Sequence, residues 1–208
     1  MPTSRLEAFS DGVLAIIITI MVLELKVPEG HGFSDLVDTT GGGLLTYLLT
    51  FVYVGIYWNN HHHMFHLVRR VSGGVLWANL ALLFCLSLFP FTTAWVDETK
   101  FQHTPVVIYG INLLAAAVAY YVLQQVIIRQ EGPGSPLREA VGADFKGKLS
   151  PAFYVLGILC ALVIDPVIDP HGHIGAGLGV ACFVAVAIMW IIPDRRIERV
   201  VRDHEAAD

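Results

Sequence analysis

The sequence predicts an all-α integral membrane protein with six transmembrane helices, forming a single domain over residues 1–208. Two properties of the composition support this fold class. Hydrophobic residues make up 55% of the chain and charged residues only 15%, whereas a soluble domain carries about 25% charged residues. The mean hydropathy is +0.61. A third observation is that the apolar residues are gathered in blocks separated by polar segments, which is typical of membrane proteins rather than of a large soluble core.

The six blocks define the predicted spans, which cover residues 6–27, 44–67, 75–96, 105–129, 151–168 and 173–192. Pro28 stops the first span, and a glycine triplet at 41–43 precedes the second. Pro90 lies inside the third span and is expected to kink it. Ser150 and Pro151 supply a cap and a first helical position for the fifth span.

The last two spans have clear ends as well. Asp165-Pro166 and Asp169-Pro170 are expected to close the fifth span, and Pro193 closes the sixth. The residues after Pro193, 194–208, are expected to form a short, charged cytoplasmic tail. Gly175 and Gly179 give the sixth helix a face of small residues, which favours close contact with another helix.

The basic residues predict the orientation. All of the 13 Lys and Arg residues except Lys26 and Lys100 lie on the side that holds the N-terminus. By the positive-inside rule, both termini are therefore cytoplasmic, in a multi-pass protein of the cell (inner) membrane. The net charge of −5 and the lack of a basic stripe argue against a nucleic-acid partner.

The loops on the opposite side are acidic. This rim either concentrates cations near an entrance or merely reflects the exclusion of basic residues from that side. Its members are Glu29, Asp35, Asp38, Asp97, Glu98, Asp165 and Asp169.

The first helix combines charge with a short apolar run. Arg5 and Asp11 lie at its start, and the uninterrupted apolar segment 12–23 is too short to cross a bilayer alone. Such a helix is better shielded at the centre of a bundle, which indicates a pore. At 100° per residue, one narrow stripe contains Arg5, Phe9, Gly12, Ile16, Ile20, Leu23 and Val27. Thr19 lies at the edge of this stripe. The alternative is that the stripe faces lipid or packs against another helix.

A second pattern gathers polar residues at the cytoplasmic ends of the first three helices. Ser10 and Asp11 point away from the apolar stripe, and the second helix ends with Trp58, His61 and His62 on one face. The third helix begins on the same side with Asn79. Because buried polar groups require partners, we expect these residues to form a hydrogen-bond network.

The histidines permit other interpretations. His62 and His66 have an i, i+4 spacing that is compatible with metal binding. No glutamate lies between them as in a zinc hydrolase helix, and three consecutive histidines at 61–63 point in three directions. We therefore expect structural hydrogen bonding and no metal site, with metal binding and a pH-responsive role as the alternatives.

The motif Arg5-x-x-x-Phe9-Ser10-Asp11-Gly12, followed by Trp58-x-x-His61-His62 and Asn79, resembles the transmembrane protein 175 family of potassium channels in its bacterial, single-repeat form. The resemblance covers essentially the whole chain. It implies a homotetramer in which the first helix lines a central pore. The implied pore constriction comprises Ile16, Ile20 and Leu23, with Thr19 beside it. The implied structural polar network comprises Arg5, Phe9, Ser10, Asp11, Trp58, His61, His62 and Asn79.

The expected function is that of a potassium-preferring cation channel with a hydrophobic constriction. No Thr-Val-Gly-Tyr-Gly loop exists to build a carbonyl filter, and no span carries a ladder of arginines for voltage sensing. We expect neither enzymatic activity nor a cofactor; K⁺ is the permeating ion. The alternative is a proton-coupled secondary transporter that uses Asp11 and the histidines of the second helix. A membrane enzyme or haem protein built on the histidines is a third hypothesis.

Overall fold

The computed structural model describes residues 2–68, 70–142, 145–168 and 173–191, and over these ranges it contains only helices and their connections. Six helical segments among the described residues are long and apolar enough to cross a membrane: 3–23, 33–66, 73–98, 103–131, 145–167 and 174–191. The predicted all-α, six-span fold class is therefore confirmed. The expected tail at 194–208, together with Asp169 and the last residue of the sixth predicted span, lies outside the described residues.

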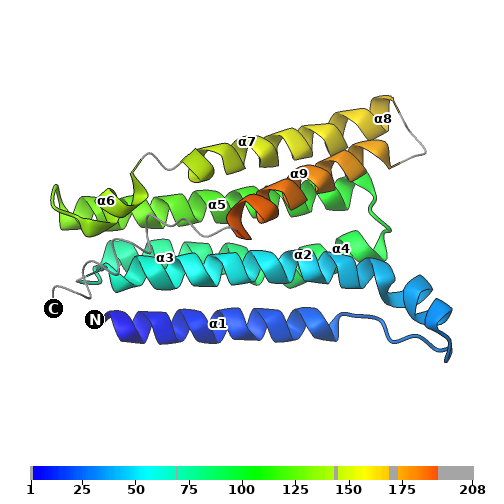
Figure 1. Cartoon of the computed structure of the whole chain (residues 1–208), viewed down its shortest axis with the longest axis horizontal. Coiled ribbons are helices and arrows are strands. Elements are labelled where there is room, and N and C mark those ends of the chain that lie inside the picture. The colour runs from blue at the N-terminus through cyan, green and yellow to red at the C-terminus, as the bar shows by residue number, and fades with distance from the viewer. Residues whose placement is uncertain (1, 69, 143–144, 169–172, 192–208) are drawn as a thin grey trace.

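The helices lie side by side along the long axis of the molecule (Figure 1). They are α1 (Thr3–Leu23), α2 (Phe33–His66), α3 (Gly73–Ser87), α4 (Phe89–Glu98), α5 (His103–Glu131), α6 (Pro136–Val141), α7 (Phe145–Leu159), η1 (Cys160–Ile164), α8 (Asp165–Val167) and α9 (Ile174–Ile191). α1 forms one edge of the bundle and packs on α2, α3 and α4. α5 is central and packs on α3, α4, α7 and α9. The edge opposite α1 is formed by α7.

α1 has one covered face and one uncovered face. Its buried residues are spaced three or four positions apart, as one face of a helix requires, and are Leu6, Ser10, Leu14, Ile17 and Met21. α1 ends at Leu23, with Glu24 as its C-cap, so Val27 lies beyond the helix and does not extend the predicted stripe.

α2 begins at Phe33 rather than at residue 44, so the glycine triplet lies inside the helix. The backbone N–H of Gly32 donates to Asp35 Oδ2 at 2.8 Å, which fixes the start of the helix and gives Asp35 a capping role. A Cβ at Gly43 would lie 2.7 Å from Asp97 Oδ2, so a larger residue there would require the Asp97 side chain to move. Helix packing therefore overrides the weak intrinsic helix propensity of these glycines.

The third span is divided at Leu88, between the end of α3 and the start of α4. Pro90 occupies the second position of α4, where its missing N–H interrupts the helical hydrogen bonds of the preceding turn. The kink predicted from Pro90 thus coincides with an interruption of the helix.

The fifth span begins at Phe145, one and a half turns before the predicted start at Pro151. Ser150 is not a cap. Its hydroxyl donates to the Lys146 carbonyl oxygen at 2.8 Å and accepts from Trp190 Nε1 at 2.8 Å, which joins α7 to α9. The Ser-Pro pair therefore lies within the helix rather than at its start.

The structure at the end of the fifth span corrects the prediction that Asp165 lies in the acidic rim of the outer loops. The helix continues through the π-helical turn η1 into α8, and Asp165 is only 3% exposed. Its carboxylate accepts from the backbone N–H groups of Gly175 at 2.6 Å and Ala176 at 2.9 Å. Asp165 therefore satisfies the N-terminus of α9 and does not add to an outer acidic rim.

The expected small-residue contact of the sixth span is confirmed. Gly175 and Gly179 are buried, and a Cβ at Gly179 would lie 2.8 Å from the Gly157 carbonyl oxygen of α7. Only glycine permits this close approach of two backbones, which membrane helices use for packing.

Candidate pore-helix anchor

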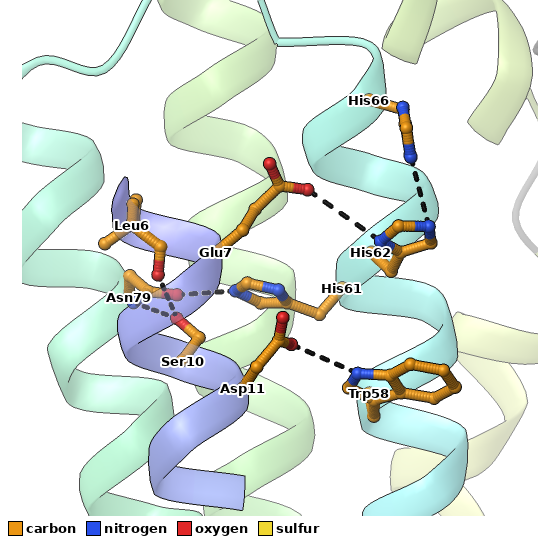
Figure 2. Close-up of polar contacts among 9 residues, drawn as sticks. All are labelled: Leu6, Glu7, Ser10, Asp11, Trp58, His61, His62, His66 and Asn79. Carbon is orange, nitrogen blue, oxygen red and sulfur yellow. Dashed lines mark hydrogen bonds and ion pairs between the residues drawn. The ribbon is translucent and has the colours of Figure 1, made fainter. Parts of the chain in front are cut away.

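The first turns of α1, the last turns of α2 and the start of α3 meet at one end of the bundle (Figure 2). This follows from connectivity, because α1 and α2 are antiparallel and only six residues separate the end of α2 from the start of α3. The side chains gathered there are Glu7, Ser10, Asp11, Trp58, His61, His62, His66 and Asn79.

A buried chain of hydrogen bonds links all three helices at this end. Asn79 Nδ2 donates to Ser10 Oγ at 3.0 Å, and His61 Nε2 lies 2.8 Å from Asn79 Oδ1. Ser10 Oγ in turn donates to the Leu6 carbonyl oxygen at 2.9 Å. Ser10 and Asn79 are completely buried, and His61 is 2% exposed.

The direction of this chain follows from donor counting. The one Ser10 proton is given to the Leu6 carbonyl, so Ser10 Oγ must accept from the Asn79 nitrogen. The Asn79 oxygen therefore faces His61, and His61 Nε2 must carry a proton to donate to it. Each of the three side chains thus determines the orientation of the next.

A second, more exposed contact joins α1 to α2. Trp58 Nε1 donates to Asp11 Oδ1 at 3.1 Å, and both residues are exposed. The Trp58 ring stacks on His62, with the two ring planes 14° apart. Trp58 therefore connects the carboxylate on α1 to the histidines at the end of α2.

His62 lies outside the buried hydrogen-bond chain of Ser10, Asn79 and His61, although the sequence predicted it in one network with them. It contacts Glu7 of α1, with Nδ1 3.9 Å from Glu7 Oε1, and its Nε2 lies 3.0 Å from His66 Nε2. Glu7 was not among the predicted site residues, and His66 was considered only with His62, in the metal-binding alternative. The sequence feature from which they could have been predicted is helical spacing. Glu7 lies one turn before Asp11, and His62 lies one turn after Trp58, so antiparallel packing brings the second pair together.

Arg5 and Phe9 lie on the exposed side of α1. Phe9 is 52% exposed, and neither side chain contributes to the hydrogen bonds drawn among the described residues of this cluster. The structure therefore brings Ser10, Asp11, Trp58, His61 and Asn79 into contact but leaves Arg5 and Phe9 outside the cluster.

The other half of α1 presents the predicted apolar stripe. Ile16 is 58% exposed, Ile20 is 42% exposed and Leu23 is 81% exposed. Thr19 is also exposed, and its Oγ1 donates to the Ile16 carbonyl oxygen at 2.8 Å. This face has no covering element within the described chain.

A cavity of about 70 Å³ lies elsewhere, between α2, α5, α6, α7 and α9, with Tyr57, Gln124, Tyr154 and Trp190 in its lining. None of the residues that line it belongs to α1. The uncovered stripe of α1 is therefore not part of this cavity.

These features define a multi-pass helical membrane protein whose edge helix carries an uncovered apolar stripe and a polar anchor. Comparison with known proteins gives the family. Residues 5–90 match the family "Endosomal/lysosomal potassium channel TMEM175". A potassium channel from Chryseobacterium sp. (strain P1-3) is 50% identical over 204 residues, which are 98% of this chain and 100% of the relative.

Two further proteins extend the comparison. The endosomal/lysosomal proton channel TMEM175 of Gallus gallus is 30% identical over 129 residues, 60% of this chain and 25% of the relative. A crystal structure of a lysosomal potassium-selective channel TMEM175 homolog from Chamaesiphon minutus superimposes with a TM-score of 0.72 and 28% identity, over 91% of this chain and 96% of that one. This chain belongs to the TMEM175 channel family, and its relatives are channels rather than enzymes.

Proposed function

We propose that the protein is a homotetrameric, potassium-preferring cation channel in which α1 of each subunit lines a shared pore. The names of its relatives support the class of ion, since the Chryseobacterium protein is a potassium channel and the Chamaesiphon homolog is described as potassium-selective. All six spans of residues 1–208 contribute to one channel domain, and conduction requires no cofactor.

The observation that carries the proposal is the two-faced character of α1. Its inner face is anchored by buried residues, while Ile16, Ile20 and Leu23 form an uncovered apolar seam at the edge of the protomer. In a symmetric assembly, copies of this seam surround the axis. A lipid-facing helix would also expose apolar residues, but it would not be expected to begin with Arg5 and Asp11.

The pore in this proposal closes by dewetting. Rings of Ile16, Ile20 and Leu23 offer water no hydrogen-bond partners, so a narrow pore lined by them empties of water and blocks hydrated cations. Ions pass when α1 moves outward. Thr19 adds a hydroxyl beside the constriction whose proton is given to the Ile16 carbonyl, leaving its oxygen lone pairs toward a cation.

The polar cluster serves to position the pore helix. The buried chain from Ser10 through Asn79 to His61, together with the contact from Trp58 to Asp11, fixes the first turns of α1 against α2 and α3. We assign these residues a positioning role, and not contact with the ion. Phe9 and Arg5, which lie on the uncovered side, are assigned to contacts between subunits.

We further propose that the channel lies in the inner membrane with both termini in the cytoplasm. The distribution of the basic residues supports this orientation. It places the polar cluster near the cytoplasmic surface and Leu23 toward the outside.

The test is ion flux from reconstituted vesicles with K⁺, Na⁺ and a large organic cation. Ile16→Asn is expected to wet the constriction, raise K⁺ flux and reduce discrimination against Na⁺. Ile188→Asn on α9 is the matched control, because Ile188 is also 58% exposed, and it should leave flux unchanged. Equal flux in the wild type and Ile16→Asn would remove Ile16 from the pore. Flux that saturates at low ion concentration would instead favour a transporter, which the names of the relatives do not support.

A further inference from the structure

We infer that Glu7, His62 and His66 form a binding site for a transition-metal cation such as Zn²⁺ that bridges α1 and α2. The ligand atoms of these three residues lie within 4.8 Å of one another. They come from two helices, since Glu7 belongs to α1 and both histidines belong to the last two turns of α2. Figure 2 shows the three side chains at the end of the bundle, with His62 between Glu7 and His66.

The separation of the donor atoms fits a metal ion. His62 Nε2 and His66 Nε2 are 3.0 Å apart. Two nitrogen ligands at the usual Zn–N distance in a tetrahedral site are about 3.3 Å apart, so both rings reach one ion with a slight outward movement. The carboxylate of Glu7 lies 3.9 Å from His62 Nδ1, so its side chain has to rotate toward Nε2 to supply the third donor.

The chemistry of the donors selects the type of metal. Two imidazoles and one carboxylate favour Zn²⁺, Ni²⁺, Cu²⁺ or Co²⁺ over Mg²⁺ and Ca²⁺, which prefer oxygen ligands only. The carboxylate also offsets part of the charge of the ion. The remaining coordination position is open to water, because the side chain of His62 is 44% exposed and that of Glu7 22%.

Aromatic contacts surround the ligands. The Trp58 ring stacks on His62 with the ring planes 14° apart, and the His66 ring meets the His62 ring edge-on at 89°. The two Nε2 atoms face each other at hydrogen-bond distance, so a shared ion would replace this direct contact. The sequence offered only the i, i+4 pair of histidines, and the third donor is the observation that turns this pair into a site between helices.

A bound ion would restrain α1, because one of its ligands lies on that helix and two lie on α2. If α1 lines the pore, as proposed above, the ion would hold the pore helix in its closed position and lower K⁺ flux. This consequence rests on the proposed function, whereas the binding site itself does not.

The binding test uses the full chain, purified in detergent, freed of metal with a chelator and titrated with Zn²⁺ in a calorimeter. We expect one Zn²⁺ per chain. His66→Ala and Glu7→Gln should each weaken binding at least about 10-fold, since even residues that only orient metal ligands contribute that much. His103→Ala, at the start of α5, is the control and should bind Zn²⁺ like the wild type.

Two results would overturn the site. One is the absence of Zn²⁺ binding by the wild type, and the other is equal affinity in the wild type, His66→Ala and Glu7→Gln. His66 is exposed, so its replacement should not prevent folding, which elution as an intact oligomer would verify. Co²⁺ substitution gives a second readout, because nitrogen-ligated tetrahedral Co²⁺ is expected to have a visible absorption band that the His66→Ala variant should lack.

A flux experiment then separates the site from its effect. Micromolar Zn²⁺ should reduce K⁺ flux through the wild type and not through His66→Ala. Stoichiometric Zn²⁺ binding with unchanged flux would overturn the regulatory effect while leaving the site intact. A wild type that binds Zn²⁺ but conducts no ions in its absence would contradict the proposed channel function and not the metal site.

Discussion

Asn79 connects three helices through one amide group. Its nitrogen donates to Ser10 on α1 and its oxygen accepts from His61 on α2, and none of these side chains has access to water. In such a setting, an unpaired group costs about 1–3 kcal/mol, whereas a made hydrogen bond contributes about 1 kcal/mol. Breaking one of these hydrogen bonds therefore costs more free energy of folding than the bond contributes when it is formed.

Replacing Asn79 by alanine should lower the stability of the folded protein by about 2–4 kcal/mol, because it leaves Ser10 and His61 without their partner and opens a small cavity. Thermal unfolding of the detergent-solubilised protein measures this. Asn59→Ala is the matched control, since no hydrogen bond of the Asn59 side chain is found in the described part of α2, and it should change the stability by less than about 0.5 kcal/mol. Similar unfolding temperatures for the two variants would contradict the structural role of Asn79.

For individual residues, the sequence predicted which side chains gather at this end of the bundle better than it predicted which of them pair. Connectivity and helical spacing correctly gathered Ser10, Asp11, Trp58, His61 and Asn79 at one end of the bundle. Helical spacing places Glu7 one turn from Asp11 and His62 one turn from Trp58, but their pairing also depends on the axial alignment of α1 and α2, which is decided by packing along their whole length.

Among the elements, α7 and α9 show how a single missing side chain sets the distance between helices. Gly179 lies against the backbone of Gly157, whereas Gly177 of the same helix has nothing near the position of a Cβ. The two glycines share a helix and differ only in the face on which they lie.

This pair gives a controlled prediction. Gly179→Ala should destabilise the fold by about 1–3 kcal/mol, because the new methyl group would lie 2.8 Å from a carbonyl oxygen and push α9 away from α7. Gly177→Ala should be neutral or stabilising by up to about 1 kcal/mol through its better helix propensity. Unfolding temperatures of both variants test this, and a Gly179→Ala protein as stable as Gly177→Ala would show that the helices are not tightly apposed there.

The predicted spans were right in number and in type because long apolar blocks leave little choice in a membrane. Their starts were less predictable. The glycine triplet at 41–43 and the Ser150-Pro151 pair are typical of helix ends, yet both lie within helices here because Asp97 and Trp190 pack on them. Contacts with residues distant in the sequence decided these helix boundaries, and the sequence near each boundary does not reveal those contacts.

For the whole molecule, the most consequential property is that α1 lies at the edge of the bundle with one side uncovered (Figure 1). The cavity of about 70 Å³ is lined by α2, α5, α6, α7 and α9 and by no residue of α1, and no described element covers the stripe of α1. A conduction path along the stripe of α1 therefore has to be completed by other copies of the chain, which is why the proposed function requires an oligomer.

Cysteine cross-linking tests this assembly directly. In a background where Cys85, Cys160 and Cys182 are replaced by alanine, Leu23→Cys should form disulfides between subunits on mild oxidation, because Leu23 is 81% exposed on the proposed axial face. Ile188→Cys on α9 should remain monomeric on a denaturing gel. Cross-linking at position 188 but not at position 23 would place the subunit contacts on α9 and contradict an axial α1.

The spacing of the contacts between α1 and α2 has a further consequence. Glu7 and Asp11 are one turn apart, as are Trp58, His62 and His66, so sliding α1 by about 5.4 Å would let Asp11 meet His62 and Glu7 meet His66. The solvent-exposed ladder is thus degenerate and tolerates two registers. The contacts of the Asn79 amide fit only one register, because a shifted α1 would leave Ser10 and His61 buried without their hydrogen-bond partner. Asn79 therefore adds to the packing of α1 a buried polar contact that favours one register over the other.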